Sequence, residues 1–135
     1  PLNTDSTVKG QAVFLAERAS ELMQDNIITD RTIIDVMAFA KCSKSMYYFE
    51  ADDFCSFASH ILEEYDYIFY VSPEGVEIEN NGVRETDAEY RKLIDQNIQL
   101  LITKYRHKIK NLIDINGSTE ERIKLVKQAI SFWYL

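Results

Sequence analysis

The stretch TIIDVMAFAKCSKS, residues 32–45, decides the predicted fold of this chain. Across residues 31–40 the apolar side chains recur at helical spacing, and Asp30 stands where a helix N-cap is expected. The predicted buried face consists of Ile33, Val36, Met37 and Ala40. A tight connection that begins at Lys41 then leads to Ser43, which would cap a third short helix. The stretch therefore predicts two short helices joined by a tight turn.

The same stretch is the centre of a longer pattern, over residues 22–48. An apolar pair at its start would end the preceding helix, and the run from Thr32 to Ser43 follows without a gap. Ala40 is small at the point where two helices would cross, and Tyr48 lies in the short helix that follows. Through these residues the segment resembles the DNA-binding domain of the TetR family of transcription regulators. The resemblance implies a helix-turn-helix whose last helix enters the major groove of DNA.

The rest of the chain predicts further helices. Apolar residues recur every three or four positions in the segments 8–25, 52–70, 87–113 and 119–135. Residues 71–86 hold most of the turn-forming residues and predict a loop, with a short hairpin as the alternative. The predicted fold class is all-α: a three-helix helix-turn-helix unit followed by long helices that pack as a C-terminal bundle, as in the TetR family. We expect a DNA-binding-like domain over residues 1–51 and a connecting and dimerisation or ligand domain over residues 52–135.

The resemblance also implies which residues would contact DNA. Those nearest the base edges would be Lys44, Ser45 and Tyr47. Those that hold phosphates would be Arg31, Thr32, Lys41 and Tyr48. Ser43 would cap the recognition helix and leave its first turn facing the groove. The implied function is a TetR-like transcription regulator, a repressor that binds double-stranded DNA as a dimer.

The charge distribution supports a different function. The net charge is -7, and residues 1–70 contain five basic against twelve acidic residues, whereas residues 71–135 contain ten of each. The helix-turn-helix half would therefore repel the DNA polyanion at long range. The alternative function is an interaction protein that keeps the helix-turn-helix fold but binds a basic partner through its acidic surface, as a DNA mimic or an inhibitor.

Apolar and aromatic residues predict two further partners, a second copy of the chain and a small apolar ligand. The segment 132–135, Phe-Trp-Tyr-Leu, is apolar, and two helices have too little surface to cover it. We therefore expect a homodimer through residues 87–135. The aromatic residues in 47–49 and 65–70 would either line a pocket for a small apolar ligand or pack in the core.

Several classes of protein are not supported by the sequence. No apolar run approaches the ~20 residues that a membrane helix needs, and the polar start does not have the order of a signal peptide. A cytoplasmic protein without membrane contact is expected. The two histidines and two cysteines do not have metal-ligand spacing, and no nucleophile elbow or phosphate loop is present. The chain is therefore predicted not to be an enzyme and to need no metal or cofactor.

Overall fold

The computed structural model describes residues 5–73 and 85–131, and the side chains of residues 85–87 are not described. Three helices come first: α1 (Val8–Glu21), α2 (Ile33–Lys41) and α3 (Tyr48–Ser59). A short 3-10 helix, η2 (Leu62–Glu64), leads into strand β1 (Ile68–Val71). The long helix α4 (Glu85–Lys104), a 3-10 helix η3 (Arg106–Lys108), strand β2 (Leu112–Ile115) and helix α5 (Thr119–Ser131) follow.

The two strands pair in parallel, with α4 as the connection between them. The register places Ile68 opposite Leu112 and Val71 opposite Ile115. The N–H of Ile68 donates to the carbonyl of Asn111 at 2.8 Å. Parallel strands cannot be joined by a tight turn, so a crossover helix between them is expected. Residues 68–115 therefore form a β-α-β unit.

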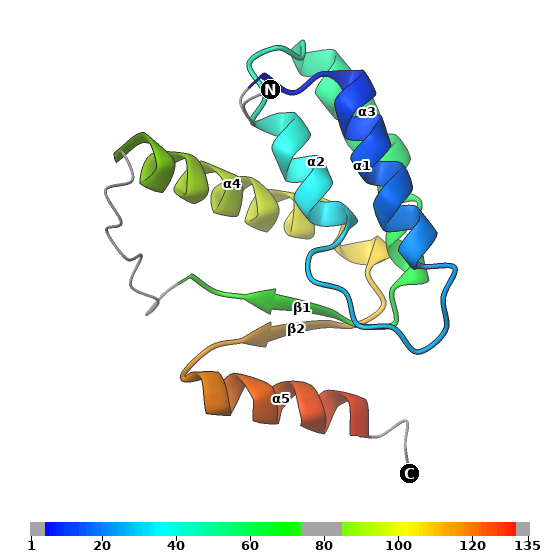
Figure 1. The fold of residues 1–135 in the computed structure, drawn as a ribbon, viewed down its shortest axis with the longest axis vertical. Coiled ribbons are helices and arrows are strands. Elements are labelled where there is room, and N and C mark those ends of the chain that lie inside the picture. Colours follow the sequence, from blue (N-terminus) through cyan, green and yellow to red (C-terminus); the bar gives the residue numbers. More distant parts are fainter. Residues whose placement is uncertain (1–4, 74–84, 132–135) are drawn as a thin grey trace.

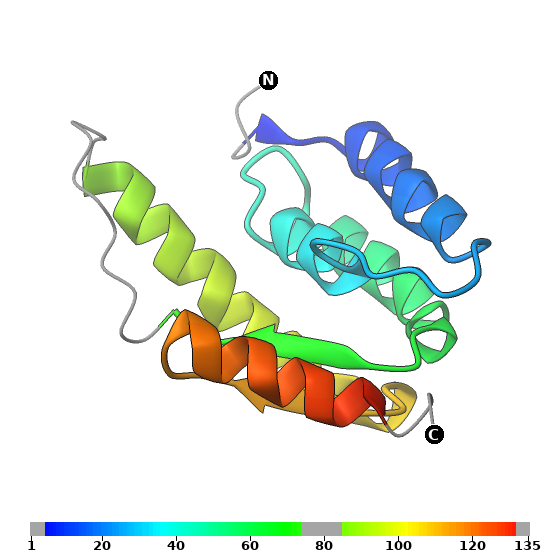
Figure 2. The same cartoon turned by 60° about the horizontal axis from the view of Figure 1, so that its bottom comes forward.

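Helices lie on both faces of this small sheet. In Figure 1, α4 and the group α1–α3 lie above the strands and α5 lies below them, and Figure 2 shows α5 in front of the strands when that side comes forward. Helix α2 packs against both α3 and α4. Ile33, Met37 and Leu62 are completely buried at the centre of the core. The arrangement is a layered α/β fold, with the core between the helices and the upper face of the sheet.

Side-chain caps determine where two of the helices begin. At α2 the N–H of Thr32 donates to Asp35 Oδ2 at 2.8 Å, while Thr32 Oγ1 accepts the N–H of Ile34 at 3.1 Å. This reciprocal pair is a capping box, which satisfies two donors that helix geometry leaves unpaired. At α5, Ser118 Oγ accepts the N–H of Glu121 at 3.2 Å. The residue that caps α2 is thus Thr32, and the expectation for Asp30 was wrong.

The all-α prediction is wrong, because two of the predicted helices each run into a strand. The helix expected over residues 52–70 ends at Ser59, and the one expected over residues 87–113 ends at Lys104. The residues wrongly assigned to helices are Ile68, Phe69 and Tyr70 of β1 and Leu112 and Ile113 of β2. A strand covered on both faces is a short continuous apolar run, which periodicity alone does not distinguish from a buried helix.

Other predictions about the elements have mixed outcomes. Helices were expected within residues 8–25 and 31–40, and α1 and α2 confirm them. The third helix does not open at Ser43; it begins at Tyr48, because the Ser43 hydroxyl instead hydrogen-bonds the carbonyl of Ser6 and the N–H of Ser45. The predicted boundary between residues 51 and 52 falls inside α3, and the division into two domains stays a prediction. The loop or hairpin expected over residues 71–86 lies mostly outside the described residues.

Candidate functional site

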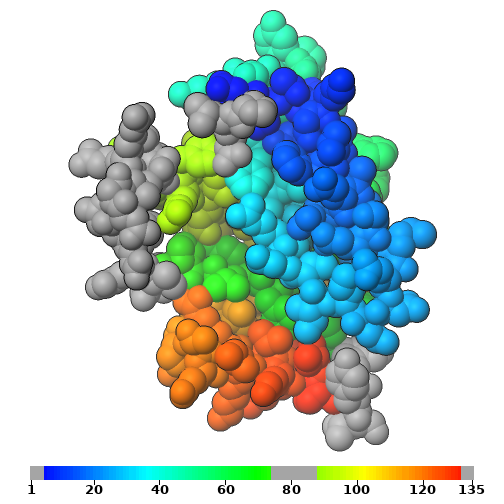
Figure 3. Space-filling model, in the orientation of Figure 1, coloured from blue at the N-terminus to red at the C-terminus, as the bar shows by residue number. Residues whose placement is uncertain are grey.

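A pocket of about 500 Å³ extends along one edge of β1. Its walls come from the segment 22–35, from residues 64–71, from α4 through Asp95, Ile98 and Ile102, and from α5 through Ile130. Because α4 and α5 cover opposite faces of the sheet, a pocket that both helices line must lie at the sheet edge. In the space-filling view, the green surface around β1 is visible between cyan residues above and the orange-to-red α5 below (Figure 3). The pocket therefore lies on the side of β1 away from β2.

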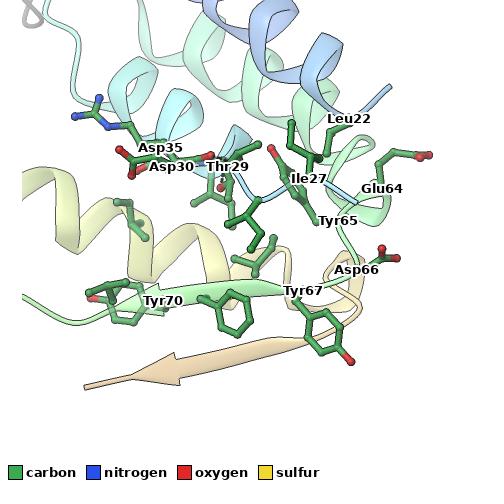
Figure 4. A pocket seen from close by; sticks show the side chains of 18 of the residues that line it. Leu22, Ile27, Thr29, Asp30, Asp35, Glu64, Tyr65, Asp66, Tyr67 and Tyr70 are labelled. Atoms are coloured by element: carbon green, nitrogen blue, oxygen red, sulfur yellow. Dashed lines mark hydrogen bonds between the residues drawn. The ribbon is translucent and has the colours of Figure 1, made fainter. Parts of the chain in front are cut away.

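The two long walls of the pocket run in the same direction. Figure 4 shows Ile27, Thr29 and Asp30 in order above β1, alongside the order from Tyr67 to Tyr70. The end near Ile27 is lined by Leu22 and Tyr65 together with the acidic side chains of Glu64 and Asp66. At the other end, polar side chains from the segment before α2, from β1 and from α4 surround the pocket: Asp30, Asp35, Tyr70 and Asp95. This is the carboxyl end of β1, the edge at which ligands bind in open α/β sheets.

Tyr70 and Asp95 form the best-defined polar contact at this end. The Tyr70 hydroxyl donates to Asp95 Oδ1 and accepts from Gln99 Nε2 at 3.2 Å, and Gln99 Nε2 also donates to Asp95 Oδ2 at 2.7 Å. Burial, and then the hydrogen bond to the Asp95 carboxylate, raise the pKa of Tyr70 to about 12. The phenol is therefore neutral at physiological pH and its proton is held by Asp95.

The segment that carries Asp30 is held in a strained conformation. Arg31 has a φ of 75°, a left-handed backbone that non-glycine residues adopt uncommonly. Thr29 Oγ1 donates to the carbonyl of Arg31 at 3.0 Å, and Arg18 Nη1 donates to the carbonyl of Asp30 at 3.3 Å. Arg31 Cζ lies 5.8 Å from the centroid of the Phe39 ring. These contacts fix the backbone, and the carboxylate of Asp30 lines the pocket.

Asp35, the second acidic residue from this segment, already has a structural role. Its carboxylate accepts the N–H of Thr32 in the capping box of α2. Burial raises the pKa of Asp35, and this hydrogen bond opposes the rise. By contrast, the carboxylate of Asp30 has no hydrogen bond or ion pair within residues 5–73 and 85–131. Asp30 is therefore the acidic group best placed to accept a hydrogen bond from a ligand.

The residues predicted to contact DNA are divided between two places. Arg31 and Thr32 line the pocket. The others lie at the end of α2, in the turn before α3 or at its start: Lys41, Ser43, Lys44, Ser45, Tyr47 and Tyr48. Lys41 is engaged within the protein, since its Nζ forms an ion pair with Asp52 and lies 4.7 Å from the centroid of the Tyr48 ring. Only two of the eight residues thus belong to the pocket.

Sequence reasoning missed the pocket residues Asp35, Tyr70 and Asp95 and treated Asp30 only as a cap. One local signal was available for Asp30: the apolar pair Ile27-Ile28 leads directly to Thr29-Asp30, as in a strand that ends in a carboxylate. No local signal joins Tyr70 to Asp95, because they meet only when α4 crosses over the sheet.

The fold and the pocket define the class of protein. Parallel strands joined by a crossover helix, helices on both faces, and polar groups at the carboxyl end of β1 are features of α/β ligand-binding folds. Residues 5–122 match the sequence model of the family described as AAA domain, and the chain belongs to that family. It is a nucleotide-binding, P-loop-type family. No curated protein and no solved structure matches the chain.

Membership of the AAA domain family corrects the resemblance to TetR regulators. The prediction of a TetR-like, DNA-binding repressor was wrong, and so was the alternative of a helix-turn-helix DNA mimic or inhibitor. The transcription-regulation class is replaced by a nucleotide-binding one. The eight residues predicted to contact DNA were assigned that role through the TetR resemblance, and this reason for the assignment no longer holds. The prediction that the chain is not an enzyme conflicts with the family only weakly.

The residues present do not supply the phosphate loop that a P-loop-type family implies. That loop has the pattern Gly-x-x-x-x-Gly-Lys-Ser/Thr, whose backbone N–H groups surround the phosphates. The four glycines of the sequence are Gly10, Gly75, Gly82 and Gly117, and none of them begins this pattern. Within the described ranges, no three His, Cys, Asp or Glu side chains are grouped to hold a metal ion. No described helix is long and apolar enough to span a membrane.

Proposed function

We propose that this chain acts in a nucleotide-binding, kinase-like domain and contacts the part of the ligand that lies away from the phosphates. The observation that carries the proposal is the position of the Asp30 carboxylate, at the carboxyl end of the β1 pocket and without a partner among the described residues. Membership of the AAA domain family supplies the class of ligand. Asp30 would accept hydrogen bonds from ligand hydroxyl groups such as those of a ribose.

The chemistry of the neighbouring groups supports this role. An ionised carboxylate only accepts hydrogen bonds, so Asp30 and Asp95 favour donors such as sugar hydroxyls and disfavour phosphate oxygens. The net charge of -7 also disfavours the binding of phosphate groups. Apolar lining residues such as Ile27 and Ile102 offer a surface for a base or another flat apolar group. Phosphate binding is not assigned to residues of this chain.

The proposal is tested by titrating the 135-residue protein with adenosine and with guanosine while following backbone amide signals by NMR. We expect shifts at Asp30, Tyr70 and their neighbours, and a several-fold weaker affinity in Asp30→Asn. The matched control is Asp25→Asn, because Asp25 is exposed in the same segment and does not line the pocket. The proposal fails if neither nucleoside shifts these signals, or if both variants weaken binding equally.

Three earlier expectations continue as proposals beside this one. A homodimer through residues 87–135 is supported by Leu93, Leu100 and Ile123, which are exposed on α4 and α5. Sedimentation equilibrium of the wild type and of Leu100→Lys tests it. A small apolar ligand would bind against the isoleucines that line the pocket, and the displacement of a hydrophobic dye by that ligand would report its binding. A cytoplasmic location is tested by cell fractionation.

A further inference from the structure

We propose that Arg18, on α1, is a positioning residue for the pocket along β1. Together with Thr29 it holds Arg31 in a left-handed backbone conformation, and so places the carboxylate of Asp30 in the pocket. Arg18 does not itself line the pocket. The part of the proposal that concerns the backbone rests on the contacts of the segment 29–31. The part that concerns ligand affinity rests on the nucleotide-binding function proposed above.

Two side chains hold the peptide groups on either side of the Arg31 Cα. Arg18 Nη1 donates to the carbonyl of Asp30, in the peptide before this Cα, and Thr29 Oγ1 donates to the carbonyl of Arg31, in the peptide after it. Because each peptide group is planar, only φ and ψ of Arg31 relate the two. A φ of 75° is costly for arginine and persists only where surrounding contacts impose it. The two hydrogen bonds are such contacts.

Arg18 is itself held in place on α1. Its Nη2 lies 3.0 Å from Oε1 of Glu21, one turn further along the helix, and both side chains are only 25% exposed. The planar guanidinium presents several donors in fixed directions, so Nη2 can pair with the carboxylate while Nη1 reaches the carbonyl of Asp30. This contact joins α1 to a segment twelve residues further along the chain. A helix outside the pocket thus fixes the backbone of one pocket wall.

The first turn of α2 is fixed by other contacts. The capping box holds the N–H of Thr32, and the hydroxyl of Tyr65 accepts the N–H of Ile33. If Arg31 relaxed to the right-handed helical region, its φ would change by more than about 100°. Since the chain after Arg31 is held, the chain before it would have to move. The carboxylate of Asp30 would then leave its place in the pocket wall.

The first test uses NMR on the 135-residue protein without ligand. A residue with positive φ gives a strong cross-peak between its own amide and Hα protons, because these two protons lie close together. We expect this cross-peak at Arg31 in wild type, and a fall of at least about two-fold in Arg18→Met as the population shifts. Thr29→Val, which removes the second donor at nearly constant size, should act in the same direction. The matched control is Lys9→Met, which removes an exposed cation from the same helix and should leave the cross-peak unchanged.

The second test measures the affinity for adenosine and for guanosine. Arg18→Met should bind nucleoside several-fold more weakly than wild type, because Asp30 is displaced. In an Arg31→Gly background the same change should weaken binding less, since glycine adopts a positive φ without a steric cost. The difference between the two backgrounds is the coupling between Arg18 and the Arg31 backbone. A merely structural role of Arg18 would give equal losses in both backgrounds.

The proposal is overturned if Arg31 keeps its strong cross-peak in Arg18→Met. It is also overturned if wild type binds a nucleoside and Arg18→Met binds it equally well, or loses affinity equally in both backgrounds. If neither nucleoside binds to wild type, the proposed nucleotide-binding function fails. In that case the cross-peak of Arg31 still decides whether Arg18 holds the backbone of this segment.

Discussion

The hydroxyl of Tyr65 accepts the backbone N–H of Ile33 at 3.1 Å, and so joins the first turn of α2 to the segment that enters β1. Ile33 is fully buried and Tyr65 is nearly so. The contact connects two walls of the pocket. Ile33 lies just after Asp30 in the segment 22–35, which forms one wall, and Tyr65 lies just before β1 in residues 64–71, which form the other. Its loss would therefore disturb both stability and the pocket.

Replacing Tyr65 with phenylalanine should lower the free energy of unfolding by about 1–3 kcal/mol, because the buried N–H of Ile33 is left without an acceptor. Urea denaturation measures the change. Tyr47→Phe is the matched control, since Tyr47 is 70% exposed. Equal stability of the two variants would contradict the assigned role.

The same tyrosine predicts a pH dependence in alkaline solution. Burial raises the pKa of Tyr65 from its ordinary value of 10.0 to about 12. Below pH 10 the hydroxyl is protonated in both states and its contribution is fully present. Between pH 10 and 12 the unfolded state loses this proton first, so stability falls as the pH rises. The fall measured by denaturation should be shallower in Tyr65→Phe than in wild type. An unchanged slope would exclude Tyr65 as a contributor.

Removing the cap of α2 should destabilise the protein by about 1 kcal/mol in Thr32→Ala, the usual effect of losing a side-chain N-cap. The control is Thr103→Ala: Thr103 is exposed and its hydroxyl donates back to the carbonyl of Gln99 within α4, so little change is expected. Thermal unfolding followed by circular dichroism compares the two. A larger loss in Thr103→Ala would show that the Thr32 cap is not the dominant contact.

The contact between Tyr70 and Asp95 should be visible in a phenol titration. In Asp95→Asn the pKa of Tyr70 should fall from about 12 toward its ordinary value, but not reach it, because burial is the larger cause. Ultraviolet difference spectroscopy, or NMR with ring-labelled tyrosine, follows the change. Asp114→Asn is a graded control, since Asp114 has the weakest of the effects that raise this pKa. If Asp114→Asn lowered the Tyr70 pKa as much as Asp95→Asn does, the effect would come from overall negative charge and not from the hydrogen bond to Asp95.

The ion pair of Lys41 with Asp52 should have a small effect on stability because both side chains are partly exposed. Lys41→Met should lower the free energy of unfolding by at most about 1 kcal/mol. It should also raise the pKa of Asp52, which the hydrogen bond from Lys41 holds below its ordinary value. NMR of the labelled carboxyl group measures this pKa. In Lys44→Met, which changes an exposed lysine in the turn before α3, the Asp52 pKa should stay where it is.

Local features of the fold were predictable from sequence. The apolar spacing in residues 8–25 and 31–40 predicts α1 and α2, and the cap at Ser118 is readable from its distance to Glu121. The resemblance to a helix-turn-helix rested on features of the same local kind. A small residue at Ala40 allows two helices to pack closely, but it does not determine which helix the partner is. In this fold α2 packs against α4 as well as α3.

Long-range features were not predictable in this way. The runs 68–71 and 112–115 are short and apolar, and only their pairing with each other makes them strands. The candidate site depends on that pairing, because it brings Tyr70 from β1 to Asp95 on α4 and places both near Asp30. It likewise becomes evident only in three dimensions that, among the described residues, β1 pairs with β2 alone.

The parallel arrangement of β1 and β2 has a consequence for the order of folding. The two strands are far apart in sequence, so their pairing must close a long segment that includes α4, whereas α1 and α2 each form from neighbouring residues. The helical layer should therefore assemble early and the sheet late. Until then the apolar strands are exposed to other chains, and nascent protein would be most prone to aggregate through β1.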